Sequence, residues 1–156
     1  MSVHQRIAIT GASGLIGTAL VGHLKAEGHT VQRLVRRTPV GADEVQWDPQ
    51  TGFVDLEPLR GVDAVIHLAG VGVGDKRWSK KYKAQILNSR LLGTEAIAKA
   101  VAEVKPQVFI SASAIGWYGE SGNRAVIESD RAGDDFLAAV CREWEAAADI
   151  ASGVRT

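Results

Sequence analysis

The sequence predicts an α/β protein in which helices cover both faces of a doubly wound parallel sheet. Apolar segments of strand length alternate with helical segments along the chain, and a glycine-rich turn joins the first strand to the first helix. Such alternation makes neighbouring strands parallel, because each strand returns across the sheet through a helix on one face. No repeat or linker interrupts the pattern, so we expect residues 1–156 to form one domain.

The expected elements follow the change from strand-like to helical periodicity. A buried strand over residues 6–10 precedes a helix over 15–27, which ends before Gly28. Pro49 and Gly52 indicate a short hairpin between two later strands. Further strands are expected over 30–35, 44–47, 53–54, 63–69 and 107–111, and further helices over 79–104 and 134–151.

Composition and charge exclude several classes of protein. The chain has 46% hydrophobic residues, enough for a packed core, and its single cysteine, Cys141, excludes an internal disulfide framework. The 18 basic and 18 acidic residues cancel, so no overall field attracts nucleic acid or an anionic membrane. No apolar run approaches the roughly 20 residues that span a bilayer. We therefore expect a cytoplasmic protein with no nucleic-acid, membrane or metal partner.

Residues 10–17 read Thr-Gly-Ala-Ser-Gly-Leu-Ile-Gly, a G-x-x-G-x-x-G pattern between a strand and a helix. Gly11 and Gly14 let the backbone turn sharply and approach a pyrophosphate, whose charge is favoured by the free N–H groups of a helix start. Gly17 lets the helix pack close to the sheet. The alternative is a tight turn without a ligand, but the flanking strand and helix favour nucleotide binding. The predicted contacts are Gly11, Ser13, Gly14, Leu15, Ile16 and Gly17.

The end of the second strand indicates which nucleotide is bound. In dinucleotide-binding folds this point faces the adenosine ribose, where an acidic residue would bind the 2′-hydroxyl group and repel a 2′-phosphate. Here the sequence is Val35-Arg36-Arg37. A guanidinium pairs with phosphate through two hydrogen bonds and stacks on adenine, so these residues favour NADP(H) over NAD(H). A solvated basic loop is the alternative, and Arg36 is the preferred contact because it is nearer the strand.

Three motifs, in this order, resemble the short-chain dehydrogenases/reductases of the extended or atypical type. They are residues 10–17, residues 63–70 (Asp-Ala-Val-Ile-His-Leu-Ala-Gly) and residues 111–119 (Ser-Ala-Ser-Ala-Ile-Gly-Trp-Tyr-Gly). More narrowly, the chain resembles the epimerase-family proteins labelled nucleoside-diphosphate-sugar epimerases. The motifs that carry this narrower resemblance are Trp47-Asp48-Pro49, Arg77-Trp78, Ser89-Arg90 with Gly93-Thr94, and Trp144-Glu145. The resemblance implies a Rossmann-type sheet and a small-molecule substrate, such as a nucleotide sugar.

The resemblance also implies cofactor contacts beyond the glycine turn. Leu68, Ala69 and Gly70 end a central strand, where small residues let the backbone run beside the adenosine and ribose, and ordinary sheet packing is the alternative. Arg90 lies where related enzymes carry an Asn before a Gly-Thr pair. The resemblance points Arg90 toward the cofactor, with Gln85 as a neighbour, and a surface position is the alternative.

The catalytic residues of this class are only partly present. The usual mechanism uses a Tyr as proton donor or acceptor, a Lys four residues later that lowers the Tyr pKa, and a Ser or Thr that binds the reacting oxygen. Ser113 follows the strand over 107–111 in the place of the hydroxyl residue, with Ser111 as the alternative. Neither Tyr82 nor Tyr118 has a Lys four positions on. Tyr118, beside Ser113, is the candidate for a substrate contact or a substitute acid.

The last helix carries other side chains where the Tyr-Lys pair is expected. Counting back from Glu145, which resembles the helix Glu of the family, places Cys141 at the Lys position and Leu137 at the Tyr position. Leu137, Cys141 and Trp144 recur at helical spacing, which predicts a stripe that packs in the core or against a second subunit. Cys141 has no neighbouring His to activate it, and His67 is expected to be a hydrogen-bonded core residue.

The C-terminal residues and the missing pair leave two functions open. Residues 153–156 resemble the start of the next strand of the family, so we expect truncation before the last strands and the substrate-binding region. The exposed sheet edge would allow homodimerisation. In one interpretation the protein is an NADP(H)-dependent oxidoreductase or epimerase, in which Ser113 orients a carbonyl or hydroxyl and Tyr118 or water moves the proton. In the other it binds NADP(H) without turnover, as a regulatory or interaction module.

Overall fold

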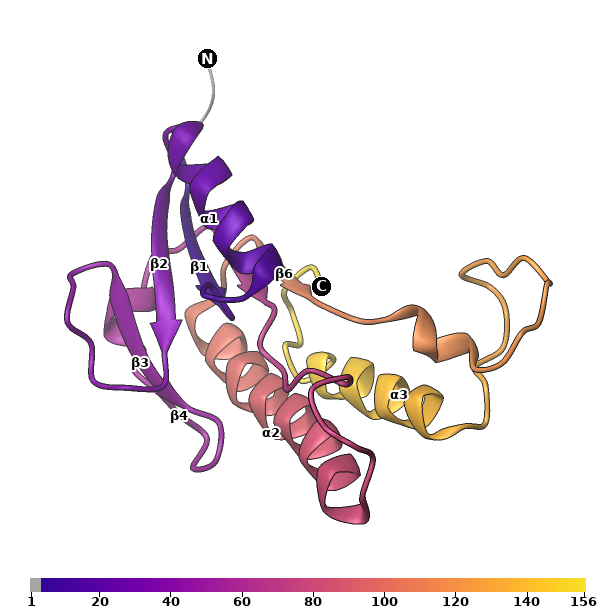
Figure 1. Ribbon diagram of the computed structural model, residues 1–156. Coiled ribbons are helices and arrows are strands. Elements are labelled where there is room, and N and C mark those ends of the chain that lie inside the picture. The colour runs from indigo at the N-terminus through magenta and orange to yellow at the C-terminus, as the bar shows by residue number, and fades with distance from the viewer. Residues whose placement is uncertain (1–3) are drawn as a thin grey trace.

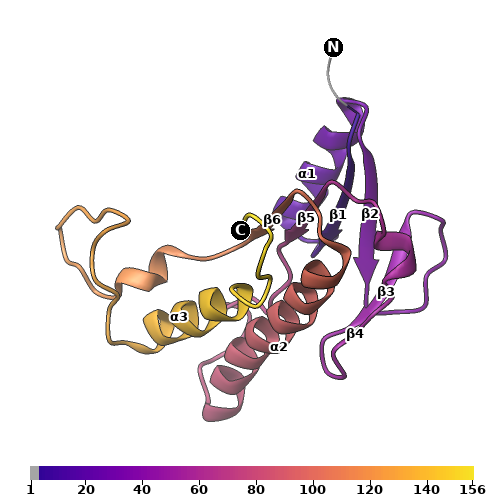
Figure 2. The same cartoon turned by 180° about the vertical axis from the view of Figure 1, so that it is seen from behind.

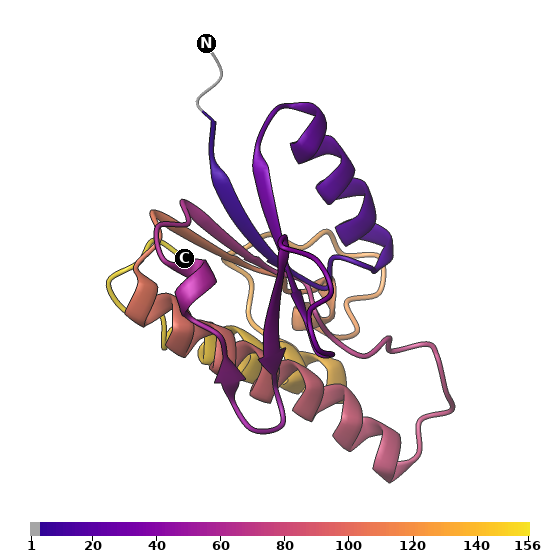
Figure 3. The ribbon, with the colours of Figure 1, turned by 90° about the vertical axis from the view of Figure 1, so that its left-hand side faces the viewer.

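The computed structural model describes residues 4–156, which form a six-stranded sheet in the order β4-β3-β2-β1-β5-β6. Helix α1 covers one face of the sheet, and α2 and α3 cover the other (Figure 1, Figure 2 and Figure 3). The strands are β1 (Arg6–Thr10), β2 (Thr30–Val35), β3 (Glu44–Asp48), β4 (Phe53–Val54), β5 (Ala64–His67) and β6 (Val108–Ser111). The helices are α1 (Leu15–Ala26), α2 (Lys80–Val104) and α3 (Phe136–Ala148), with the short 3-10 helices η1 (Glu57–Leu59) and η2 (Ile115–Tyr118). The predicted α/β sheet with helices on both faces is confirmed.

The order of the strands reverses direction at β1. The chain moves outward from β1 through β2 and β3, and then returns to the other side of β1 with β5 and β6. These strands are parallel, and the short β4 pairs antiparallel with β3. The carboxyl ends of β1 and β5 therefore meet at the reversal, with Thr10 opposite His67.

Strand β3 has a second partner beyond the predicted hairpin. The hairpin with β4 forms, and β3 also pairs in parallel with β2. A crossover between parallel strands normally needs a dozen or more residues, yet residues 36–43 make this one without a helix. They suffice because Glu44, the first residue of β3, lies opposite Arg33 near the end of β2, so the chain returns by only a small part of a strand length.

Alternate residues of the central strand face the two helix layers. Ile7 and Ile9 of β1 pack on the α1 side, whereas Ala8 between them packs on the side of α2 and α3. A shift of one residue in the pairing would exchange these faces, so the apolar pattern fixes the register. The helical partners are Leu20, Val21 and Leu24 in the α1 layer, and Ile97, Ala98 and Val101 in the other layer.

Polar side chains cap the two helices of the second layer close to their predicted starts. Ser79 accepts a hydrogen bond from the Tyr82 N–H group at 3.1 Å before α2, and Asp135 accepts one from the Ala138 N–H group at 2.8 Å before α3. The helix predicted over 134–151 ends earlier, at Ala148, and the residues that follow it form turns.

The apolar stripe predicted for α3 packs against the rest of the molecule. Cys141 and Trp144 are buried, Leu137 is half-buried, and α3 contacts both α2 and η2. Beyond β6, the Phe109 N–H group donates to the Arg155 carbonyl oxygen at 2.8 Å, in agreement with the strand start predicted over 153–156. Among residues 4–156, no helix is both long enough and apolar enough to cross a membrane.

Gly17 fixes how the first helix meets the glycine turn. A Cβ atom at Gly17 would overlap the Gly11 carbonyl oxygen and lie 2.8 Å from Cα of Ala12. The sequence predicted that Gly17 lets α1 approach the sheet, but the close contact is with the turn that precedes the helix. Because the contacted atoms belong to the backbone, no rotation of a side chain relieves an overlap there.

We expect Gly17→Ala to lower the free energy of unfolding by about 1–3 kcal/mol or more, because the added methyl group displaces the turn. Gly22→Ala is the matched control in the same helix, since a Cβ atom there meets no atom of residues 4–156 within 4 Å. The free energy of unfolding of the control should rise by up to about 1 kcal/mol, because Ala has a higher helix propensity than Gly. Urea unfolding followed by circular dichroism measures both, and equal effects of the two substitutions would contradict the contact.

Candidate functional site

The candidate site lies at the carboxyl ends of β1 and β5, where the strand order reverses. The glycine turn follows β1, and Leu68, Ala69 and Gly70 follow β5. Ligands of open α/β sheets bind in the crevice outside the carboxyl ends of the strands at such a reversal. The fold therefore brings the residues predicted from the glycine pattern to the same edge as residues 68–70.

The buried hydroxyl group of Thr10 joins the two strand ends. Its Oγ1 atom accepts hydrogen bonds from the N–H groups of Leu68 at 3.1 Å and Ala69 at 3.3 Å, and lies 2.7 Å from Nδ1 of His67. Because Oγ1 already accepts from two N–H groups, its own proton is assigned to the bond with Nδ1. A side chain of β1 thus fixes the backbone that follows β5.

His67 is a neutral core residue. Its side chain is buried, and its ring meets the Trp47 ring edge to face, with centroids 6.0 Å apart. Burial lowers the pKa of the imidazole to about 4, so the ring is uncharged at neutral pH. With Nδ1 accepting from Thr10, the ring proton lies on Nε2, which has no hydrogen-bond partner within residues 4–156. The predicted core position is confirmed, but only one ring nitrogen is hydrogen-bonded.

Gly11 lets the turn lie directly against the end of β5. Its φ angle is +68°, and a Cβ atom would lie 2.9 Å from the carbonyl carbon of Leu68. Gly14 then precedes α1 without a side-chain cap, and no acidic residue occupies the first helical turn. The N–H groups at this end of α1 are therefore open to an anion. The exposed side chains beside them are those of Ser13, Leu15 and Ile16.

The residues predicted to bind a 2′-phosphate differ in their contacts. Val35 is half-buried at the end of β2. The Arg37 guanidinium donates to both carboxylate oxygens of Glu44, at 2.6 and 2.7 Å, and is already paired. Arg36 is exposed, and in the described part of the chain its guanidinium takes part in no hydrogen bond or ion pair. Of the two arginines, Arg36 is the one available to an anion.

Glu44 is a buried carboxylate that organises the loop after β2. Besides Arg37, it accepts a hydrogen bond from the Val40 N–H group at 2.9 Å and lies 3.2 Å from the Arg33 guanidinium. The hydrogen bonds from Arg37, and then that from Val40, lower the pKa of Glu44 to about 2. Since two guanidinium groups offset its charge, this carboxylate adds little repulsion toward an anion at Arg36.

Arg90 reaches the loop after β5 from α2. Its Nη1 atom donates to the Val71 carbonyl oxygen at 2.9 Å, and its guanidinium lies 4.9 Å from the ring centroid of Trp144. A Cβ atom at Gly70 would lie 3.4 Å from Cζ of Arg90, so Arg90 borders the predicted contacts after β5. Burial lowers the pKa of this guanidinium, and no carboxylate among residues 4–156 forms an ion pair with it.

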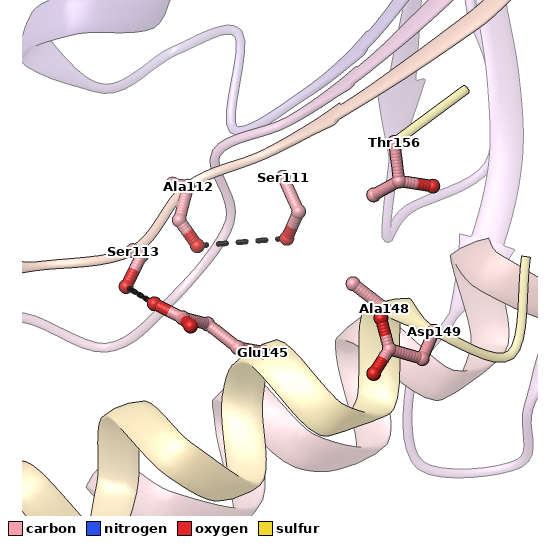
Figure 4. A pocket seen from close by; sticks show the side chains of 7 residues that line it. All are labelled: Ser111, Ala112, Ser113, Glu145, Ala148, Asp149 and Thr156. Atoms are coloured by element: carbon pink, nitrogen blue, oxygen red, sulfur yellow. Dashed lines mark hydrogen bonds between the residues drawn. The ribbon is translucent and has the colours of Figure 1, made fainter. Parts of the chain in front are cut away.

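Ser113 lies beyond the end of β6 and donates a hydrogen bond to the Glu145 carboxylate of α3 (Figure 4). Both residues are exposed, and both line two neighbouring hollows. The first hollow also contains Ser111, and the second contains Tyr118. The two predicted catalytic residues, Ser113 and Tyr118, are therefore brought to one hollow.

The face of α3 next to η2 lacks a proton-transferring pair. A Cβ atom at Gly116 of η2 would lie 3.2 Å from Cβ of Leu137 and 3.7 Å from Sγ of Cys141. Burial raises the pKa of the Cys141 thiol, which donates weakly to the Ala114 carbonyl oxygen at 3.7 Å. Leu137 and Cys141 thus pack against η2, in agreement with their predicted packing role.

Sequence reasoning did not single out Thr10, Glu44 or the contact of Ser113 with Glu145. A threonine that ends an apolar strand, and an acidic residue that begins one, are the signals from which the first two could have been found. The third contact joins residues 32 positions apart, which no spacing rule covers.

Asp48 and the predicted contact Gln85 lie outside the network around Thr10. Asp48 accepts hydrogen bonds from the Gln50 N–H group at 2.9 Å and the Thr51 hydroxyl at 3.1 Å, which hold the turn between β3 and β4. Gln85 is exposed on α2. No group of three His, Cys, Asp or Glu side chains in residues 4–156 is placed to hold a metal ion.

A glycine turn at the reversal point of a parallel α/β sheet is the mark of a dinucleotide-binding protein with a Rossmann-type fold. The model of the NAD dependent epimerase/dehydratase family matches residues 7–138, and the chain belongs to this family. The family resemblance seen in the sequence motifs is thereby confirmed.

Several known proteins are similar to this chain. An epimerase family protein of Mycobacterium leprae is 48% identical over 141 residues, which are 90% of this chain and 46% of that protein. The crystal structure of a nucleoside-diphosphate sugar epimerase from Corynebacterium glutamicum is 40% identical, with a TM-score of 0.82, over 96% of this chain and 31% of that one. Human epimerase family protein SDR39U1, in a crystal structure with NADPH, is 31% identical, with a TM-score of 0.78, over 92% of this chain and 48% of that one. The chain spans about half the length of the curated relatives it matches.

We expect Thr10→Val to lower the free energy of unfolding by about 2–4 kcal/mol, because the N–H groups of Leu68 and Ala69 lose their acceptor. Thr10→Ser is the control, since it keeps the hydroxyl and removes only one methyl group. We expect it to lower the free energy of unfolding by about 1 kcal/mol. Urea unfolding measures both effects, and amide hydrogen exchange at residues 68 and 69 reports the local contact. Equally fast exchange in the two variants would contradict the role of the hydroxyl.

His67 makes stability depend on pH below neutrality. The unfolded imidazole binds a proton near its ordinary pKa of 6.5, whereas the folded one does so only near a pKa of about 4. The unfolded state therefore binds more protons as the pH falls through this window, and stability decreases. We expect His67 to account for a loss of about 2 kcal/mol between about pH 7 and about pH 5.

The measurement is urea unfolding of the wild type and of His67→Gln across this pH range. The free energy of unfolding of the variant should depend less on pH, because the contribution of His67 is absent. The stability that Glu44 contributes through its lowered pKa is lost only as the pH falls below the ordinary carboxyl value of 4.5. Glu44 therefore does not affect the comparison of the two proteins between about pH 7 and about pH 5. Parallel pH profiles of the two proteins would show that the folded imidazole titrates normally.

Proposed function

We propose that this chain is the NADP(H)-binding part of an epimerase-like oxidoreductase or isomerase that acts on a small carbonyl compound or a sugar nucleotide. The observation that carries the proposal is Arg36, an exposed arginine with no ion pair among residues 4–156, at the end of β2. In Rossmann-type folds this point faces the adenosine ribose. A guanidinium there favours a 2′-phosphate, and no acidic residue occupies positions 35–37.

The loop around Arg36 supports a strongly anionic ligand. Between residues 33 and 44 the chain has three arginines and two acidic residues, a net charge of +1. The two acidic side chains, Asp43 and Glu44, are both paired with Arg33, and Glu44 is also paired with Arg37. A phosphate at Arg36 would therefore meet a positive charge that these carboxylates do not already use.

The rest of the cofactor suits the reversal point. The open N–H groups at the start of α1 suit a pyrophosphate, and the Arg90 guanidinium brings a positive charge close to Gly70. Its contacts in the described residues are backbone carbonyl groups and the Trp144 ring, so its charge is available to an anion. The NADPH in the structure of the human relative supports the choice of cofactor.

The proposed chemistry assigns one role to the cofactor and the others to residues near β6. Bound NADP(H) gives or takes the hydride. Ser113 binds the reacting oxygen, and Tyr118, in the same hollow, contacts the substrate or donates a proton. A sugar nucleotide is the proposed substrate class because the Corynebacterium glutamicum relative is named a nucleoside-diphosphate sugar epimerase.

A second candidate function is an NADP(H)-binding module without turnover. It is favoured by Leu137 and Cys141, which stand where a Tyr and a Lys transfer the proton in related enzymes and pack against η2 instead. Single-turnover mixing of NADPH with nucleotide sugars and short-chain carbonyl compounds separates the candidates. Consumption of NADPH supports the enzyme, and binding without consumption supports the module.

We expect Arg36→Ala to weaken NADPH binding by about ten- to a hundredfold, on the order of 1.5–3 kcal/mol, and to leave NADH binding unchanged. The reason is that only NADPH carries the 2′-phosphate. Fluorescence titration with each reduced cofactor gives both dissociation constants. Arg131→Ala removes the same charge from another exposed loop and should leave both constants unchanged. Equal weakening of NADPH and NADH by Arg36→Ala would rule out the 2′-phosphate contact.

A further inference from the structure

One face of α3 presents three residues, each four positions apart, to the segment that follows β6. Leu137 and Cys141 lie against Gly116, and Glu145 continues the row one helical turn further on. Glu145 accepts the hydrogen bond of the Ser113 hydroxyl (Figure 4). The one carboxylate of this row thus contacts the residue that we propose to bind the reacting oxygen.

We propose that Glu145 is a positioning residue that orients the Ser113 hydroxyl and exchanges its proton during turnover. This inference rests on the proposed function, in which a substrate oxygen is bound at Ser113. A hydroxyl that donates to a carboxylate keeps its oxygen lone pairs free, so Ser113 can still accept a hydrogen bond from a substrate hydroxyl. The two side chains then form a path for a proton where the usual Tyr-Lys pair is absent.

The other titratable groups nearby are less well placed for this role. Tyr118 lines the second hollow, but within residues 4–156 it makes no hydrogen bond to Ser113. The Cys141 thiol is buried and held against a backbone carbonyl group. Glu145 lines both hollows, as Ser113 does. The other acidic side chains that line a hollow, each in one of the two, are Asp149 and Glu128.

The step balances in both directions. In oxidation, a carbinol C–H bond of the substrate breaks and its hydride passes to NADP⁺, while a C=O bond forms. The carbinol proton passes to Oγ of Ser113 as the Ser113 proton passes to the Glu145 carboxylate. Glu145 then releases that proton to water, since it is exposed. Reduction of a carbonyl group follows the same path in reverse, with the proton supplied by Glu145 and the hydride by NADPH.

The first test uses the protein at its full natural length and follows single-turnover loss of NADPH fluorescence with the panel of nucleotide sugars and carbonyl compounds. Glu145→Ala should slow the reaction by about a hundredfold or more. Added formate should restore part of the rate, because it supplies the missing carboxylate. Glu143→Ala is the matched control, an exposed carboxylate on another side of the same helix, and should leave the rate unchanged. An unchanged rate in Glu145→Ala, or a loss that formate does not restore, would overturn the proposal.

The second test needs no turnover and so separates this proposal from the proposed function. Infrared difference spectra between the wild type and Glu145→Gln isolate the carboxylate stretching bands of Glu145. We expect these bands to shift in Ser113→Ala, because the hydroxyl no longer donates to the carboxylate. Bands that stay in place would overturn the proposal even in an active enzyme. Shifted bands in a protein that binds NADPH without consuming it would instead refute the enzymatic function, and the proton exchange with it.

Discussion

The hydroxyl group of Thr10 determines how the carboxyl ends of β1 and β5 meet. It accepts from the N–H groups of Leu68 and Ala69 and contacts His67, so one side chain satisfies polar groups from three consecutive residues. The glycine turn depends on this arrangement, because Gly11 lies directly on the backbone of Leu68. The start of α1 depends in turn on the glycine turn, because Gly17 leaves no space beside the Gly11 carbonyl group. A buried hydrogen bond between two strands is thus linked, through the contacts of Gly11 and Gly17, to the open N–H groups at the start of α1.

Positive charge gathers at this edge although the chain as a whole is neutral. The start of α1, Arg36 and Arg90 come from three different elements, and among residues 4–156 neither arginine is paired with a carboxylate. The nearby Glu44 does not reverse this balance, because it is paired with both Arg37 and Arg33. Arg37 therefore offsets the charge of a carboxylate, while Arg36 takes part in no ion pair among residues 4–156. The two adjacent arginines therefore differ: Arg37 is paired with Glu44, and Arg36 is the one that we propose to bind a phosphate.

The parts of this structure that sequence predicted well are those that depend on local pattern. The predicted bounds of β1 and β2 match the structure, and α2 begins one residue from its predicted start, because periodicity and a capping serine mark these boundaries. Contacts between distant residues were not predictable in the same way. The Thr10 hydroxyl meets His67 across 57 positions, and the pairing of Arg37 with Glu44 depends on how far β3 is offset from β2. The glycine pattern identified the right turn, but the contact made by Gly17 follows from the path of the backbone, which the pattern does not contain.

The replacement of the usual proton-transfer pair changes the kind of chemistry that α3 can support. A Lys acts on a neighbouring Tyr through its positive charge, which makes the phenol a stronger acid. Glu145 lies one helical turn beyond the Lys position and has the opposite charge, so it cannot assist a phenol in that way. A carboxylate acts differently. A hydroxyl that donates a hydrogen bond to a carboxylate becomes a stronger hydrogen-bond acceptor, and it can accept from a third group. In the proposed function, the proton path from Ser113 to Glu145 takes the place of a tyrosine on this helix, while Leu137 and Cys141 pack against η2.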